Sequence, residues 1–135
     1  MGQVCPYTCL LMVCLALIPS QALSQEIKGY SQTYKACMVK ANGTTFDTIS
    51  CQQAELDIQD KRLNQHYKAL LKNLNAERQE DLKVAQRAWL AFRNANCSFY
   101  LDPEGGSMHR VLSSDCVLSH TTTRANELKD MLEIF

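Results

Sequence analysis

Residues 48–100 read TISCQQAELDIQDKRLNQHYKALLKNLNAERQEDLKVAQRAWLAFRNANCSFY, and this stretch decides the fold. It contains no proline or glycine, and its apolar residues recur every three or four positions, as on one face of a helix. In the first half they are Leu56, Leu63, Tyr67, Leu70 and Leu74; in the second they are Leu82, Ala85, Trp89 and Phe92. Asn75 interrupts the pattern. The sequence therefore predicts two long helices, joined near Asn75 into an antiparallel hairpin.

A short helix is predicted before this hairpin and a closing helix after it. Residues 30–41 have weak helical character and end at the turn signal Asn42-Gly43, after which Asp47 is expected to cap the long helix. Residues 101–106 form the clearest loop, and a last helix is expected from Ser107 or Ser113 to Leu132. No stretch alternates with the period of a strand. The fold class predicted is all-α, a small disulfide-linked helical bundle with one domain over residues 25–135.

The first 24 residues have the composition of a secretory signal peptide. Leu10 to Ile18 are uninterruptedly apolar, Pro19 follows, and small residues stand at Ala22 and Ser24. Nine helical residues rise only about 14 Å, which is half of a ~30 Å hydrocarbon core, so a membrane span is not predicted. Every charged residue lies beyond residue 24. We expect residues 1–24 to be removed on export to the periplasm or the exterior.

Four cysteines remain after residue 24, namely Cys37, Cys51, Cys97 and Cys116. An even number in a small exported chain indicates two disulfides, and the wide spacing does not resemble that of zinc ligands. Reversal near Asn75 would bring Cys51 and Cys97 to the same end of the hairpin. Three pairings are possible. We prefer Cys37–Cys51 and Cys97–Cys116, because each would bridge neighbouring elements across one loop.

Several polar residues lie on or beside the apolar stripes and are predicted to form a structural polar core. They are Asp60, Asn64, Gln86, Trp89, Arg93 and Arg124. Reversal near Asn75 would bring Asp60 opposite Arg93, where an ion pair could fix the register of the two helices. The alternative is a polar groove that faces a ligand. Arg124 is expected to dock on the hairpin; alternatively, the threonines before it present a surface.

Composition and motifs exclude several classes of function. Lys and Arg number 14 against 14 Asp and Glu, so the chain lacks the basic surplus of nucleic-acid-binding proteins. The three histidines are scattered, and no catalytic, phosphate-binding or metal-binding motif is present. We therefore expect no catalytic residues, no cofactor and no metal, and we expect the protein not to be an enzyme.

Two blocks of sequence resemble the LprI-type lysozyme inhibitor N-terminal domain family. The first runs from Cys51 through Ala54-Glu55-Leu56-Asp57 to Asp60-Lys61, Leu63-Asn64 and Tyr67. The second is Leu82-Lys83, Gln86-Arg87-Ala88-Trp89-Leu90 and Phe92-Arg93, followed by Cys97. Gly105-Gly106, Cys116, Thr121, Arg124 and Glu127-Leu128 complete the resemblance. It covers residues 37–132 and implies a small exported bacterial helical domain.

The resemblance implies a protein partner, a lysozyme, whose cleavage of peptidoglycan would be inhibited. The nearest candidate for insertion into a carbohydrate cleft is the loop that carries Asp102, Glu104, Gly105 and Gly106. An alternative is a non-inhibitory periplasmic binding module, including an immunity-type one, and a hydrolase is the least favoured. The sequence does not predict the oligomeric state.

Overall fold

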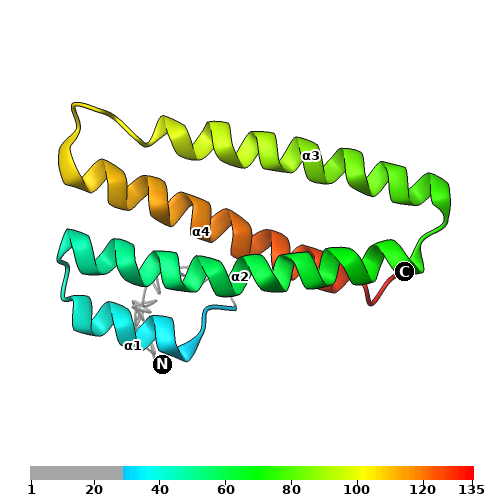
Figure 1. The fold of residues 1–135 in the computed structure, drawn as a ribbon, viewed down its shortest axis with the longest axis horizontal. Helices are drawn as coiled ribbons and strands as arrows, with labels where there is room; N and C mark the ends of the chain where they lie inside the picture. The colour runs from blue at the N-terminus through cyan, green and yellow to red at the C-terminus, as the bar shows by residue number, and fades with distance from the viewer. Residues whose placement is uncertain (1–28) are drawn as a thin grey trace, which may run out of the picture.

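The computed structural model describes residues 29–135, which form four helices. They are α1 (Gln32–Ala41), α2 (Thr45–Asn73), α3 (Ala76–Phe99) and α4 (Gly106–Met131). Successive helices run in opposite directions (Figure 1). The predicted all-α bundle is confirmed, and residues 29–135 contain no strand. The expected signal peptide, residues 1–24, lies outside the described residues.

Local capping interactions set the boundaries of the first two helices. Ser31 caps α1, its side chain accepting a hydrogen bond from the Tyr34 N–H. Asn42 adopts the left-handed conformation that ends α1. The expectation that Asp47 caps α2 is wrong, because Thr44 is the cap and Asp47 lies in the first turn, accepting a bond from the Thr44 hydroxyl at 2.6 Å. A carboxylate in the first turn still interacts favourably with the positive end of the helix dipole.

The predicted reversal at Asn75 is present. The Asn75 side chain caps α3 by accepting from the Arg78 N–H at 2.9 Å, and Leu74 ends α2 in an extended conformation. The last helix begins at Gly106, one residue before the earlier of its two expected starts.

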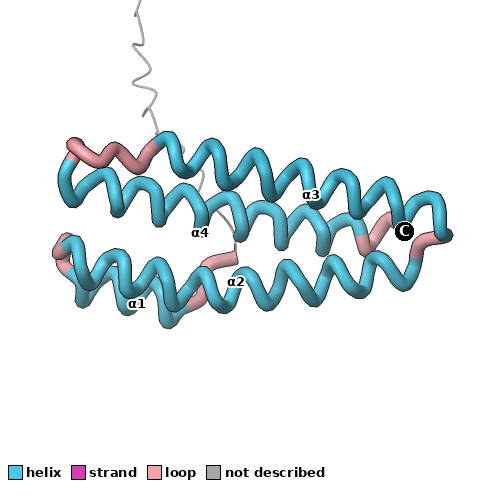
Figure 2. Tube along the Cα trace, turned by 45° about the horizontal axis from the view of Figure 1, so that its top comes forward, coloured by secondary structure: helices cyan, strands magenta, loops and turns pink. Residues whose placement is uncertain are grey.

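The C-terminal helix α4 lies at the centre of the molecule. It runs parallel to α2 and packs along it, with α3 on its other side and α1 against α2 (Figures 1 and 2). The α2 and α3 helices follow each other in the chain and run antiparallel, as predicted for a hairpin. Their backbones approach closely at few points, because α4 lies between them.

The apolar core gathers toward the end of the bundle where α2 turns into α3. It consists of Leu63, Leu70, Leu82, Ala125 and Leu128. On α3, the expected stripe of Leu82, Ala85, Trp89 and Phe92 is only partly buried: Leu82 is buried, whereas Ala85 and Phe92 are exposed. The face toward α4 is rotated to include Gln86 and Cys97, which are buried.

Candidate functional site

Two disulfides hold together the end of the bundle that carries the α1–α2 turn and the α3–α4 loop. Cys37–Cys51 joins α1 to α2 with a Cα–Cα distance of 5.7 Å, and Cys97–Cys116 joins α3 to α4 with one of 5.4 Å. This is the pairing that the hairpin argument favoured. The second bridge therefore ties the last turn of α3, just before the α3–α4 loop, to a point ten residues into α4.

The loop itself is tightly folded around Asp102. The Asp102 carboxylate accepts from the Glu104 N–H at 2.9 Å, and its carbonyl accepts from the Gly105 N–H at 3.1 Å. The His109 ring closes the loop, with its Nδ1 3.2 Å from the Tyr100 carbonyl oxygen. A Cβ on Gly105 would lie 2.2 Å from the His109 ring, so a larger residue there would require this ring to move. These contacts hold the Asp102 and Glu104 side chains in exposed positions.

Apolar side chains surround the loop and point to solvent. Phe99 is 85% exposed, Met108 is 62% exposed and Leu101 is 50% exposed. Exposed apolar surface can mark a binding site, so this end of the molecule is a candidate. We call this surface the end patch and define it by Phe99, Leu101, Asp102, Glu104 and Met108.

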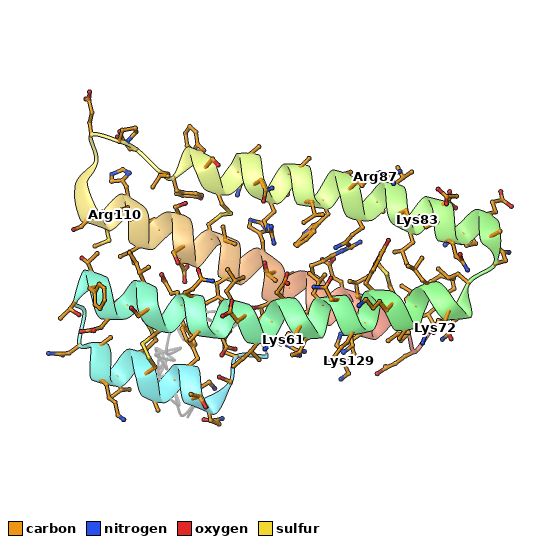
Figure 3. The ribbon with its side chains drawn as sticks, in the orientation of Figure 1. Lys61, Lys72, Lys83, Arg87, Arg110 and Lys129 are labelled. Atoms are coloured by element: carbon orange, nitrogen blue, oxygen red, sulfur yellow. A yellow bond between two sulfur atoms is a disulfide. The ribbon has the colours of Figure 1, made fainter. Side chains whose placement is uncertain are left out.

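A hollow lies at the same end of the bundle, between the starts of α2 and α4. It has a volume of about 320 Å³, and Phe46 and Arg110 line it with Ser107. Figure 3 shows Arg110 near the start of α4, on the loop side of the molecule. Sequence reasoning missed Phe46, Phe99, Met108 and Arg110, because nothing in their spacing separates them from residues that a neighbouring helix covers.

The residues expected in a structural polar core are divided between the interior and the surface. Gln86 and Arg124 are buried, Trp89 and Arg93 are partly buried, and Asp60 and Asn64 are exposed. The expected Asp60–Arg93 ion pair is not among the salt bridges of the described residues. Asp60 instead accepts from the Asn64 amide at 3.0 Å. Asp60 and Arg93 line the same hollow of about 410 Å³, with Val117 of α4, but do not pair across it.

A polar seam joins α3 to α4. Arg124 donates through Nε to the Gln86 carbonyl oxygen at 3.1 Å, and Arg93 donates to the Thr121 hydroxyl at 3.1 Å. The Arg93 and Arg124 guanidinium groups both lie against the Trp89 ring, at 5.0 and 6.0 Å from its centroid. Arg124 therefore docks on α3 as expected, and Gln86, Trp89 and Arg93 of the second sequence block hold α3 in place.

A buried carboxylate lies where the start of α1 meets α2, and nothing in the sequence pointed to it. Glu55 is 1% exposed and accepts from the Ser31 N–H at 2.9 Å and the Ser31 hydroxyl at 2.5 Å. Gln59, which is fully buried, donates to Glu55 at 2.6 Å and to the Gly29 carbonyl at 2.8 Å. This cluster fastens the chain before α1 onto α2.

Near this cluster, burial raises the pKa of two further side chains, Tyr30 and Asp115. It raises the pKa of Tyr30 to about 12, with the negative charge of Asp115 adding to the effect. Burial also raises the pKa of Asp115 above its usual value, although a hydrogen bond from Gln52 opposes the shift. Both groups lie where α1 and its preceding turn are held, so we assign them to structure.

One cluster has the composition of a metal site. The ligand atoms of Cys97, Cys116 and His120 lie within 4.8 Å of one another. The two sulfurs are bonded to each other, so neither can act as a thiolate ligand. His120 is engaged with the Asn96 amide at 3.2 Å. In the oxidised protein this cluster is a cross-link and not a metal centre.

The family model for "Lysozyme inhibitor LprI" matches residues 37–128, which include all four helices in whole or in part. The chain belongs to the LprI family. The match spans both disulfides, the polar seam and the α3–α4 loop. The family is described as one of lysozyme inhibitors.

A curated relative extends the comparison without adding a function. An uncharacterized protein of Rhizobium meliloti (strain 1021) is 34% identical over 103 residues, which cover 76% of this chain and 68% of that protein. No solved structure matches the chain. In residues 29–135, none of the helices has the length and hydropathy needed to cross a bilayer.

Proposed function

We propose that the protein, after export to the periplasm or the exterior, binds and inhibits a lysozyme-type peptidoglycan hydrolase through the end patch. Membership of a lysozyme inhibitor family is the observation that carries this proposal. Two intact disulfides agree with a location outside the reducing cytosol.

The end patch has the chemistry of a protein-binding surface. Aromatic residues and methionine are enriched in the buried centres of protein interfaces, and Phe99 and Met108 supply both here. Asp102 and Glu104 offer negative charge to lysozymes, which are usually basic, and such complementarity speeds association. The bonds from the Glu104 N–H to Asp102 and between His109 and the Tyr100 carbonyl order the loop before binding, which lowers the conformational entropy lost when the partner docks.

A wall-lysis assay tests this proposal. The purified, oxidised protein is added to a lysozyme that is clearing a suspension of bacterial walls, and turbidity is followed. We expect dose-dependent slowing of lysis. Unchanged lysis at large molar excess would reject inhibition, and binding measured by calorimetry without slower lysis would support the non-inhibitory binding module instead.

Exposed-residue variants locate the site. Replacing both anchors, Phe99→Ser with Met108→Ser, should weaken inhibition at least tenfold, since interface anchors commonly contribute about 2 kcal/mol or more. The matched control is Val84→Ser, which removes an apolar side chain that is 56% exposed on α3, away from the loop. If Val84→Ser weakens inhibition and the double variant does not, the site lies elsewhere.

A further inference from the structure

A second cavity lies at the opposite end of the bundle from the end patch. It has a volume of about 380 Å³ and lies where the end of α2, the start of α3 and the end of α4 meet. This volume lies in the range of small-molecule pockets. Its apolar walls are formed by Leu70, Leu74, Leu82, Met131 and Phe135.

One of the two cations that line the cavity is buried. Arg124 is 8% exposed, and its described hydrogen bonds use Nε, which donates to Gln86, and Nη1, which donates to Glu127 at 2.9 Å. A guanidinium carries five N–H donors, so these two bonds leave others available to an acceptor in the cavity. The Glu127 side chain is 49% exposed, so its pairing with Arg124 is partly screened by water.

The second cation, Arg78, is on the surface side of the cavity. Its guanidinium pairs with Asp81 at 3.1 Å, with both side chains more than half exposed, and lies 5.5 Å from the centre of the Phe135 ring. An exposed ion pair of this kind contributes little to stability. Asp81 also lines the cavity, so an incoming anion has to displace this carboxylate from Arg78, toward the solvent to which both side chains are already exposed.

We propose that this cavity binds an anionic amphiphile of the fatty-acid class. The alkyl chain occupies the space between Leu70, Leu82 and Met131, and the carboxylate accepts hydrogen bonds from Arg124 while Arg78 adds positive charge. Arginine binds carboxylates in a planar, often bidentate geometry, which suits this head group. The site is separate from the end patch, so it does not depend on the proposed inhibition of lysozyme.

The only tryptophan of the chain supplies the assay, because Trp89 packs against the Arg124 guanidinium. Dodecanoate, kept below its critical micelle concentration, should change Trp89 fluorescence saturably. Decanoate, two methylenes shorter, should bind roughly tenfold more weakly. Dodecanol and dodecyltrimethylammonium should bind at least tenfold more weakly than dodecanoate. Equal binding of dodecanoate and dodecanol would overturn the role of the cations, and no saturable binding of dodecanoate, by fluorescence or calorimetry, would overturn the site.

Two pairs of variants test the location, with helicity checked by circular dichroism. Ala85→Phe places a ring in the cavity wall and should abolish binding, whereas Ala88→Phe, on a neighbouring exposed position outside the wall, should leave it unchanged. Arg78→Gln should weaken binding of dodecanoate several-fold, whereas Arg87→Gln, outside the cavity, should not. Unaltered binding to Ala85→Phe would contradict the proposal. All four variants should slow the lysis of bacterial walls by lysozyme as much as the wild-type protein does.

Discussion

Glu55 is a carboxyl group in the interior, and the partners described for it include no cation. Its two carboxylate oxygens instead accept from the Ser31 N–H, the Ser31 hydroxyl and the Gln59 amide. A buried polar group is tolerated when hydrogen bonds within the protein replace those it made with water. The sequence could not reveal this, because a glutamate in the middle of a polar helix usually faces solvent.

Replacing this carboxylate should be strongly destabilising. Glu55→Ala would leave the donors of Ser31 and Gln59 without their acceptor, and each unsatisfied buried group costs about 1–3 kcal/mol. We expect a loss of about 3 kcal/mol in the free energy of unfolding, measured by urea titration. Glu77→Ala, at an exposed position in the first turn of α3, serves as the control and should leave the midpoint nearly unchanged. Equal effects of the two variants would contradict the role assigned to Glu55.

The raised pKa of Tyr30 predicts a loss of stability at alkaline pH. Its folded-state pKa is about 12 against an ordinary value of 10.0, so the folded protein holds this proton more tightly than the unfolded chain. The resulting stability is complete below pH 10 and is lost as the pH rises through about 12. The difference in unfolding free energy between wild type and Tyr30→Phe should therefore be constant below pH 10 and should fall above it. A difference that stays constant would show that Tyr30 is not perturbed.

At the scale of the elements, α3 is attached to the bundle differently from α2. Of its 24 residues only Leu82, Gln86 and Cys97 are buried, and polar contacts with α4 complete the attachment. The apolar period predicted that α3 exists. It did not predict the start of the helix, because α3 begins at Ala76, six residues before the first residue of the apolar stripe, Leu82. It misplaced the inward face, because Gln86 and Arg93 occupy positions that a helical wheel gives to flanking polar residues.

Removing the Cys97–Cys116 cross-link should loosen α3 selectively. The bridge spans 19 residues, and its loss should lower the free energy of unfolding by about 3 kcal/mol in the loop-entropy model. In the double variant Cys97→Ser, Cys116→Ser, amide exchange in the second half of α3 should accelerate more than in α2. The control, Cys37→Ser with Cys51→Ser, removes a bridge of 14 residues and should accelerate α1 instead. Equal acceleration of all helices in both variants would contradict separate anchoring.

At the scale of the whole molecule, the sequence predicted the helices, the reversal at Asn75 and the disulfide pairing, but not the central place of α4. An apolar stripe indicates that one face of a helix is buried, but it does not indicate which neighbouring helix covers that face. The α2 stripe, with Leu63 and Leu70, packs in a cluster with Ala125 and Leu128 of α4 as well as Leu82 of α3. The Asp60–Arg93 prediction failed for the same reason, since it assumed direct contact between α2 and α3.

Asp102, Glu104 and the paired glycines made the α3–α4 loop the candidate binding loop in the sequence. The structure shows which contacts order this loop. Gly106 adopts a φ of +72°, which favours glycine, and a Cβ at Gly105 would require the His109 ring to move. The apolar members of the end patch came only from the structure. These side chains are exposed because no further helix of residues 29–135 covers the loop. A local sequence pattern does not indicate whether such a cover exists.

The most direct test of the account is a hydrogen–deuterium exchange footprint of the oxidised protein with and without a lysozyme that it inhibits. We predict protection concentrated in residues 99–112 and at the start of α2, with little change where α2 turns into α3. Tight binding whose protection lies only at the α2–α3 turn, or along α1, would contradict the assignment of the disulfide-held end as the inhibitory surface.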